Sequence, residues 1–222
     1  MAEKIIFSWS GGKDSALALA KIKKENKYQI ASLLTTVTKD YNRISMHGVR
    51  KNLLQTQAES LGLPLEIIEI TKNGSNGQYE RAMKKILRKY SKAGIKKVAF
   101  GDIFLEDVRK YREKKLAEVG LKAIFPLWQK STKRLANQFI KQGFKAIVTC
   151  VDTKSLDKNF AGRKFDKKFL NDLPMGVDPG GENGEFHSFV YDGPIFKNKV
   201  LFKKGKIVLR NKRFYYCDLI PE

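Results

Sequence analysis

The chain has 222 residues, enough for one well-filled core or for a main domain with a smaller partner. Its hydrophobic content of 42% is ordinary for a globular protein. No apolar run approaches the roughly 20 residues that span a bilayer, so we expect no membrane partner.

The chain is strongly basic, with 44 lysines and arginines against 23 acidic residues and a formal net charge of +21. These basic residues are spread along nearly every predicted helix, as solvated helix faces are, and no RNA-binding module is recognisable. We therefore do not expect a nucleic-acid partner. Cys150 and Cys217 form no Cys-x-x-Cys, and no signal-like segment precedes the first strand, so we expect buried thiols in a cytoplasmic protein.

The first predicted element is a buried strand at residues 5–7, which runs through a glycine pair into an Ala/Leu-rich helix. A strand that passes through glycines into a helix is typical of a phosphate-binding site. The glycines let the backbone approach an anion, and the free amides of the helix start face it with the positive end of the helix dipole. The loop consists of Ser10, Gly11, Gly12, Lys13, Asp14 and Ser15.

This loop fits neither the Walker A pattern nor the dinucleotide pattern Gly-x-Gly-x-x-Gly. It resembles the PP-loop of the ATP pyrophosphatases, which split ATP between the α and β phosphates. By residue type, the amides of Gly11 and Gly12 would hold pyrophosphate, and the hydroxyls of the flanking serines would add hydrogen bonds. Lys13 would supply a point charge, and Asp14 would hold Mg²⁺.

Strands and helices then alternate, with strands predicted at residues 29–37, 65–70, 97–103 and 123–125. This alternation predicts a doubly wound, mostly parallel α/β sheet, in which ligands gather at the carboxyl ends of the strands. Leu34 and Thr35 are therefore candidates to contact adenine, although they also fit an ordinary strand end. Gly101 and Asp102 lie at the end of the fourth strand, and we expect Asp102 to be a second magnesium or ATP contact.

Residues 46–50 lead into a helix on the same side of the predicted sheet. We include Met46 among the nucleotide contacts. His47 is interpreted as structural or solvated and not as catalytic, and Arg50 is left open between a phosphate contact and surface charge.

After Pro126 the regular alternation of predicted strands and helices ends, and we place a soft domain boundary there, between residues 1–126 and residues 127–222. The second part is predicted to be a smaller α+β domain, with a helix at 133–142, a strand at 144–150 and a terminal hairpin over 199–219. The hairpin turn is placed at Lys204 and Gly205.

A glycine-rich acidic block covers residues 175–188 and is too polar for a core. Its spacing does not match an EF-hand. We interpret it as a loop that grips substrate and is delivered to the ATP crevice from the second domain. The predicted substrate contacts are Glu182, Asn183, Gly184 and Glu185.

Over nearly its full length the chain resembles the diphthine–ammonia ligase family. The resemblance rests on residues 8–15, 46–50, 101–103 and 181–196. It implies a five-stranded nucleotide-binding domain with a smaller C-terminal domain, and an ATP-dependent reaction that adenylates a carboxylate and amidates it with ammonium. The implied acceptor is diphthine on elongation factor 2, with ATP and Mg²⁺ as cofactors. Glu182, Glu185 or His187 would orient ammonia or take its proton.

The block departs from the family pattern Glu-Gly-Gly-Glu-Tyr/Phe-Glu-Thr: Asn183 replaces Gly and His187 replaces Glu. This resembles a bacterial subgroup acting on other acceptors, so a cobalamin-related small molecule stays open. A tRNA-modifying enzyme and a nucleotide sensor without turnover stay open as well, and so does a homodimer.

Overall fold

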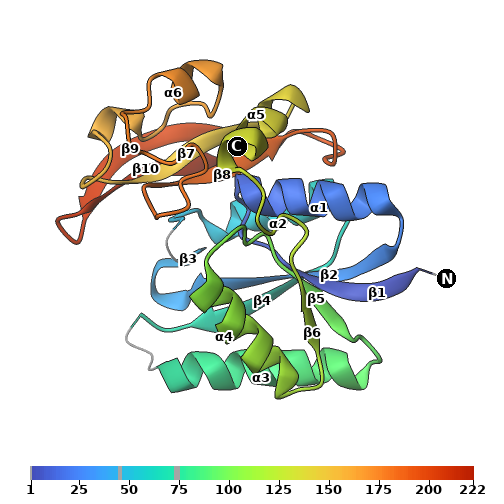
Figure 1. Ribbon diagram of the computed structural model, residues 1–222. Coiled ribbons are helices and arrows are strands. Elements are labelled where there is room, and N and C mark those ends of the chain that lie inside the picture. The colour runs from blue at the N-terminus through green and yellow to red at the C-terminus, as the bar shows by residue number, and fades with distance from the viewer. Residues whose placement is uncertain (1, 45–46, 73–75) are drawn as a thin grey trace.

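The computed structural model describes residues 2–44, 47–72 and 76–222. Two sheets lie one above the other, the N-terminal sheet below and the C-terminal sheet above (Figure 1). Met46, which we predicted to contact nucleotide, falls outside the described residues. Within those residues, no helix has the length and apolar character that crossing a bilayer requires.

The lower sheet has five parallel strands in the order β4-β2-β1-β5-β6. A sixth, two-residue strand, β3, pairs antiparallel with the end of β2. The prediction of a mostly parallel, five-stranded α/β sheet with an additional smaller domain is therefore confirmed. The strands are β1 (Glu3–Ser8), β2 (Tyr28–Thr38), β3 (Arg43–Ile44), β4 (Leu65–Ile70), β5 (Lys97–Ala99) and β6 (Lys122–Ile124).

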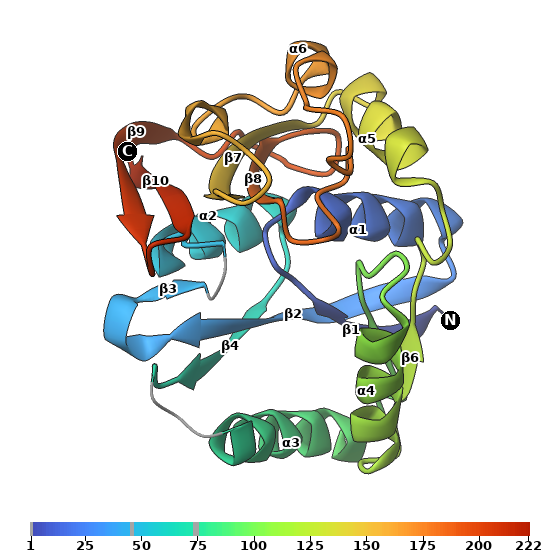
Figure 2. The same ribbon diagram turned by 60° about the vertical axis from the view of Figure 1, so that its left-hand side comes forward.

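Helices cover both faces of the lower sheet. Helices α1 (Lys13–Glu25) and α2 (Lys51–Leu61) lie on the upper face, between the two sheets, while α3 (Asn76–Lys92) and α4 (Glu106–Ala117) lie below (Figure 2). A short 3-10 turn, η1 (Lys39–Tyr41), follows β2. The position of helix α1 explains its composition. Because sheets press on it from both sides, Ala16, Leu17, Ala18 and Leu19 are all buried, which only small and apolar residues allow.

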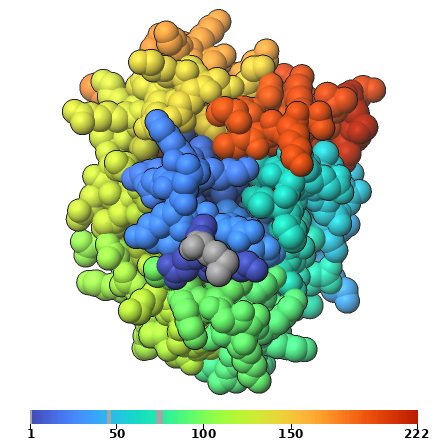
Figure 3. All heavy atoms as spheres, turned by 90° about the vertical axis from the view of Figure 1, so that its right-hand side faces the viewer, coloured from blue at the N-terminus to red at the C-terminus, as the bar shows by residue number. Residues whose placement is uncertain are grey.

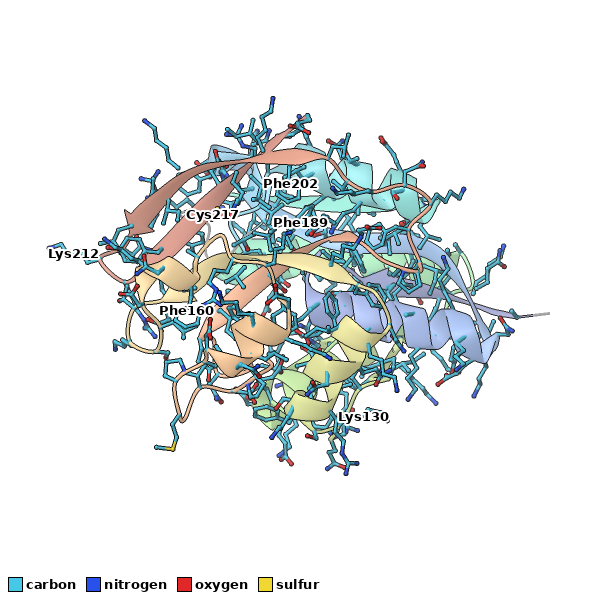
Figure 4. All side chains as sticks on the ribbon, turned by 90° about the horizontal axis from the view of Figure 1, so that it is seen from above. Lys130, Phe160, Phe189, Phe202, Lys212 and Cys217 are labelled. Carbon is cyan, nitrogen blue, oxygen red and sulfur yellow. The ribbon has the colours of Figure 1, made fainter. Side chains whose placement is uncertain are left out.

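The upper sheet is antiparallel, in the order β8-β7-β10-β9. It contains β7 (Lys145–Asp152), β8 (Phe186–Asp192), β9 (Phe202–Arg210) and β10 (Phe214–Pro221), and it is flanked by α5 (Thr132–Lys141), η2 (Lys158–Phe160) and α6 (Lys167–Asn171). Seen from above, Phe189 lies beside Phe202, with ring centroids 6.1 Å apart, and Lys212 marks the tip of the terminal hairpin (Figure 4).

The terminal hairpin is present, but our turn prediction was wrong. Lys204 and Gly205 lie inside β9, and the chain reverses at Asn211 and Lys212, which have φ of 51° and 53°. Two successive left-handed residues make the tight turn whose twist matches paired strands.

The two sheets are joined by one continuous apolar core that includes residues of β1, α1, α2, α5, β7 and β8. A second core fills the space between the lower sheet and α3 and α4. Figure 3 shows the C-terminal part packed directly on the N-terminal part. Polar contacts reinforce the junction. Arg50 forms a two-point ion pair with Asp218 of β10, at 2.6 and 3.1 Å, and the Lys197 amide donates to the Ser60 carbonyl at 2.8 Å. Arg50, which we left open between a phosphate contact and surface charge, is thus paired with a carboxylate in this structure.

Candidate active site

The predicted phosphate loop connects β1 to α1 and winds around the start of the helix. Gly11 has φ of 75°, which glycine adopts without strain, and Gly12 is extended and precedes the first helical residue. The Gly12 amide donates to Ser10 Oγ at 3.2 Å, and Ser10 Oγ lies 2.5 Å from Ser15 Oγ. The amides that open α1 lie at the positive end of the helix dipole, which favours an anion.

Glycine is required at two further close approaches. A Cβ on Gly12 would lie 3.0 Å from His47 Cε1 and 3.2 Å from the Ser188 carbonyl oxygen. A Cβ on Gly101, which follows β5, would lie 2.9 Å from the Ser15 amide nitrogen. The end of β5 is therefore pressed directly against the first turn of α1.

Lys13 and Asp14 form an ion pair of 2.8 Å at the helix start, with side chains 6% and 26% exposed. Burial raises the pKa of Asp14 above its ordinary value, against the opposing effect of the Lys13 charge. The Lys13 ammonium also lies 5.5 Å from the centre of the Phe186 ring. Of the pair, the carboxylate is the partner more accessible to a cation.

Strand β8 brings the C-terminal sheet onto the phosphate loop. The Lys13 amide donates to Ser188 Oγ at 3.2 Å, and the Val190 amide donates to the Gly11 carbonyl at 2.9 Å. His47 Nδ1 lies 3.2 Å from the Ser188 carbonyl oxygen. Since a carbonyl only accepts, Nδ1 carries the proton in this contact and Nε2 keeps its lone pair.

The acidic loop before β8 is held together by two of its own carboxylates. Buried Glu185 accepts hydrogen bonds from the amides of Asp178 and Asn183, at 3.0 and 2.9 Å, and from Asn183 Nδ2 at 2.9 Å. Burial alone would raise the pKa of Glu185, but these donors outweigh it and the pKa lies below its ordinary value. Asp178 accepts from the amides of Gly180 and Glu182 and from the Thr132 hydroxyl.

Glu182 differs sharply from Glu185. Burial, together with the negative charge of Asp14, raises the pKa of Glu182 to about 8. Asp178 and Asp102 add to the effect, while the Lys13 ammonium opposes it. The loop therefore places Glu182 in the same electrostatic field as the start of α1, with its protonation changing near neutral pH.

His47 and His187 form a pair, with ring centroids 4.7 Å apart. Burial lowers the pKa of His47 to about 4 and that of His187 to about 3, so both rings are neutral at pH 7. His187 Nε2 is buried and has no hydrogen-bond partner among the described residues. His187, where the sequence departs from the family pattern, thus lies next to a histidine that we did not interpret as catalytic.

The remaining residues predicted to contact nucleotide or metal are Asp102, Leu34 and Thr35. Asp102 faces Arg112, with its Oδ2 2.8 Å from Arg112 Nε, so a cation already neutralises it in this structure. Leu34 and Thr35 are buried between neighbouring strands, each 4% exposed. The Leu34 carbonyl accepts from the Trp9 amide at 2.8 Å. Whether these residues contact nucleotide stays a prediction.

Sequence reasoning missed two residues that organise the site. Gln57, which is fully buried in α2, bonds to Trp9, Gly11 and Val190. Ser188, in the upper sheet, accepts a hydrogen bond from the first amide of α1. A glutamine among apolar helix residues could have signalled a buried polar contact. No local feature of the sequence indicates that Ser188 contacts the start of α1.

Comparison with known proteins decides the family. Residues 3–123 match the family described as "Diphthamide synthase N-terminal domain", and residues 131–218 match "Diphthamide synthase C-terminal domain". The chain belongs to the diphthamide synthase family. The recognition made from the sequence motifs is thereby confirmed.

Several proteins named diphthine–ammonia ligase are similar to this chain. The Schizosaccharomyces pombe protein is 25% identical over 92% of the chain, which spans only 37% of that protein. The Mus musculus protein is 24% identical over 91% of the chain and 84% of its own length. The Homo sapiens protein is 26% identical over 54% of the chain and 47% of its own length.

Among solved structures, the U34-tRNA thiolase NcsA from Methanococcus maripaludis with its [4Fe-4S] cluster overlaps 62% of this chain and 56% of its own. The TM-score is 0.38 and the identity 21%. An overlap this loose carries no conclusion about function.

Proposed function

We propose that this protein is an ATP-dependent ligase of the PP-loop type, which converts a carboxylate to an amide. In the first step a carboxylate oxygen of the acceptor bonds to the α-phosphorus of ATP, and pyrophosphate leaves. In the second step ammonia bonds to the activated carbonyl carbon and AMP leaves, with the departing ammonium proton passing to a base. Adenylation is needed because a free carboxylate is a poor electrophile.

The observation that carries the proposal is the loop of residues 10–15 at the start of α1, pressed against a second domain of the same family. The amides at the helix start suit pyrophosphate, and Lys13 supports them with a nearly buried charge. Such preorganised donors stabilise charge that develops on the leaving group.

The donors present fit a magnesium ion that arrives with its nucleotide. Among the described residues, no group of three His, Cys, Asp or Glu side chains lies close enough to hold a metal alone. Mg²⁺ normally takes one or two carboxylates plus substrate phosphates, and Asp14 offers a partly exposed carboxylate where negative charge accumulates. When bound, the ion would neutralise phosphate charge. Asp102 would join it only by releasing Arg112.

We assign different roles to the two glutamates of the acidic loop. Glu182 exchanges its proton near neutral pH, which suits a group that takes a proton from ammonium. Glu185 has its oxygens occupied by loop amides, so we propose that it positions Glu182 and Asn183. His187, neutral and with an unpartnered Nε2 among the described residues, would orient ammonia or the acceptor.

Diphthine is the acceptor suggested by the relatives' names, and a small-molecule carboxylate is the alternative suggested by His187. We further propose that residues 1–126 bind ATP and residues 127–222 select the acceptor. ¹⁵N-ammonium and ATP should be incubated with diphthine-bearing elongation factor 2, a small-metabolite fraction or tRNA. ATP-dependent ¹⁵N in either carboxylate source supports a ligase and names its acceptor. Modification of tRNA alone, without ¹⁵N, would contradict it.

A further inference from the structure

A buried glutamine, outside every motif that identified the family, holds the phosphate loop in place. Gln57 is fully buried in the middle of α2. Its Oε1 accepts from Trp9 Nε1 at 2.9 Å, and its Nε2 donates to the Gly11 carbonyl at 3.1 Å and to the Val190 carbonyl at 2.6 Å. These contacts use both amide protons.

The orientation of this side-chain amide is unambiguous. The indole N–H of Trp9 can only donate, and the two carbonyls can only accept, so exchanging the oxygen and nitrogen of Gln57 would break all three contacts. Gln57 therefore ties the end of β1, the phosphate loop and β8 together in one fixed arrangement.

The consequence for the loop follows from peptide geometry. The Gly11 carbonyl is held from two directions, by Gln57 Nε2 and by the Val190 amide. In a trans peptide the carbonyl and the following N–H point in opposite directions. Fixing the Gly11 carbonyl toward α2 and β8 therefore turns the Gly12 N–H the other way, toward Ser10 Oγ at the helix start.

The opposite orientation is otherwise accessible, because glycines on both sides of this peptide permit a flip. A flipped peptide would direct a carbonyl oxygen at the phosphates in place of an N–H. We propose that Gln57 is a positioning residue for the nucleotide, which keeps the Gly12 N–H on the side of the loop where Ser10 Oγ lies and where the phosphates of ATP would bind. This inference rests on the proposed function, since it presumes that the loop binds ATP.

Two variants and a matched control test it. Gln57→Met keeps the length of the side chain and removes its hydrogen bonds, while Gln57→Glu puts an acceptor against both carbonyls. Gln55→Glu makes the same chemical change at an exposed position of the same helix. Dissociation constants for Mg²⁺·α,β-methylene-ATP and for adenosine would be measured by NMR titration at 10 °C, with circular dichroism as the check on folding.

We expect Gln57→Met to weaken binding of the ATP analogue at least tenfold and binding of adenosine less than twofold, and Gln55→Glu to change neither. Equal weakening of both ligands by Gln57→Met would mean general loosening and would overturn the proposal, as would unchanged binding of the analogue. Wild-type protein that does not bind the analogue would instead overturn the proposed function.

A variant-free measurement covers the case in which neither Gln57 variant folds. In ¹⁵N-labelled wild-type protein, the Gly12 amide resonance should be among those that move most when magnesium pyrophosphate is added. A Gly12 resonance that does not move while other loop amides do would overturn the proposal.

Discussion

Gly101→Ala tests whether the close approach of β5 to α1 shapes the nucleotide site. The added Cβ would lie 2.9 Å from the Ser15 amide nitrogen, 3.0 Å from the Asp14 carbonyl carbon and 3.1 Å from Ser15 Cα. All three are backbone atoms, so no side chain can rotate away. Ordinary contact begins near 3.4 Å, and the start of α1 must therefore move by roughly half an ångström.

The expected cost follows from that displacement. Overpacking of this kind costs about 1–3 kcal/mol, and each kcal/mol lowers Tm by about 2–4 °C in a chain of this length. Because the displaced atoms belong to the phosphate loop, affinity for Mg²⁺·α,β-methylene-ATP should also fall, by about tenfold. Scanning calorimetry measures the first effect, and isothermal titration calorimetry at 15 °C measures the second.

Gly94→Ala provides the control. A Cβ there meets nothing within 4 Å, but φ is 86°, so the substitution costs about 1–2 kcal/mol of backbone strain far from the loop. We expect a lower Tm with unchanged nucleotide affinity. If Gly101→Ala lowered Tm but bound the analogue as tightly as Gly94→Ala does, β5 would not shape the site.

Three further predictions concern the junction, the acidic loop and the cysteines. Asp218→Asn removes partly exposed ion pairs with Arg50 and Arg43, so the free energy of unfolding should fall by about 1 kcal/mol in dilute buffer and hardly at all in 1 M salt. An equal loss in urea titrations at both salt concentrations would argue against it. Glu182 ordinarily releases its proton near pH 4.5 but holds it to about 8 when folded. The stability it contributes is therefore present below pH 4.5 and lost as pH rises through 8. Glu182→Gln in metal-free buffer should reduce the slope of unfolding free energy against pH by the equivalent of up to one proton. An unchanged slope would contradict the shift. Burial raises the pKa of the Cys150 thiol to about 12 and also raises that of Cys217, so a disulfide reagent at pH 8 should label neither in folded protein and both in urea; rapid labelling of folded protein would refute this.

The phosphate loop could be predicted because its signals are local. The strand, the glycine pair and the helix of residues 5–20 are contiguous, and the order of strands and helices then determined a parallel sheet. The expectation of unpaired thiols also held, since both cysteines are free and buried. These features need only the composition and spacing of neighbouring residues.

Contacts between distant segments could not be predicted in the same way. The position of Gln57 among apolar helix residues hints at a buried polar contact, but its partner Val190 lies 133 positions away and could not be named from the sequence. Asp102 was expected to contact magnesium or ATP, which stays a prediction, and the sequence did not reveal that Arg112 of the following helix lies 2.8 Å from it. The hairpin turn was misplaced because Gly205 is a common turn residue, whereas the left-handed Asn211 and Lys212 carry a weaker signal.

The central claim is that ATP is split between its α and β phosphates. The most direct measurement follows α-labelled ATP with Mg²⁺, ammonium and each acceptor fraction, comparing wild-type protein with Asp14→Ala. We predict labelled AMP that depends on one acceptor and is lost in the variant. Labelled ADP as the sole product would contradict the account.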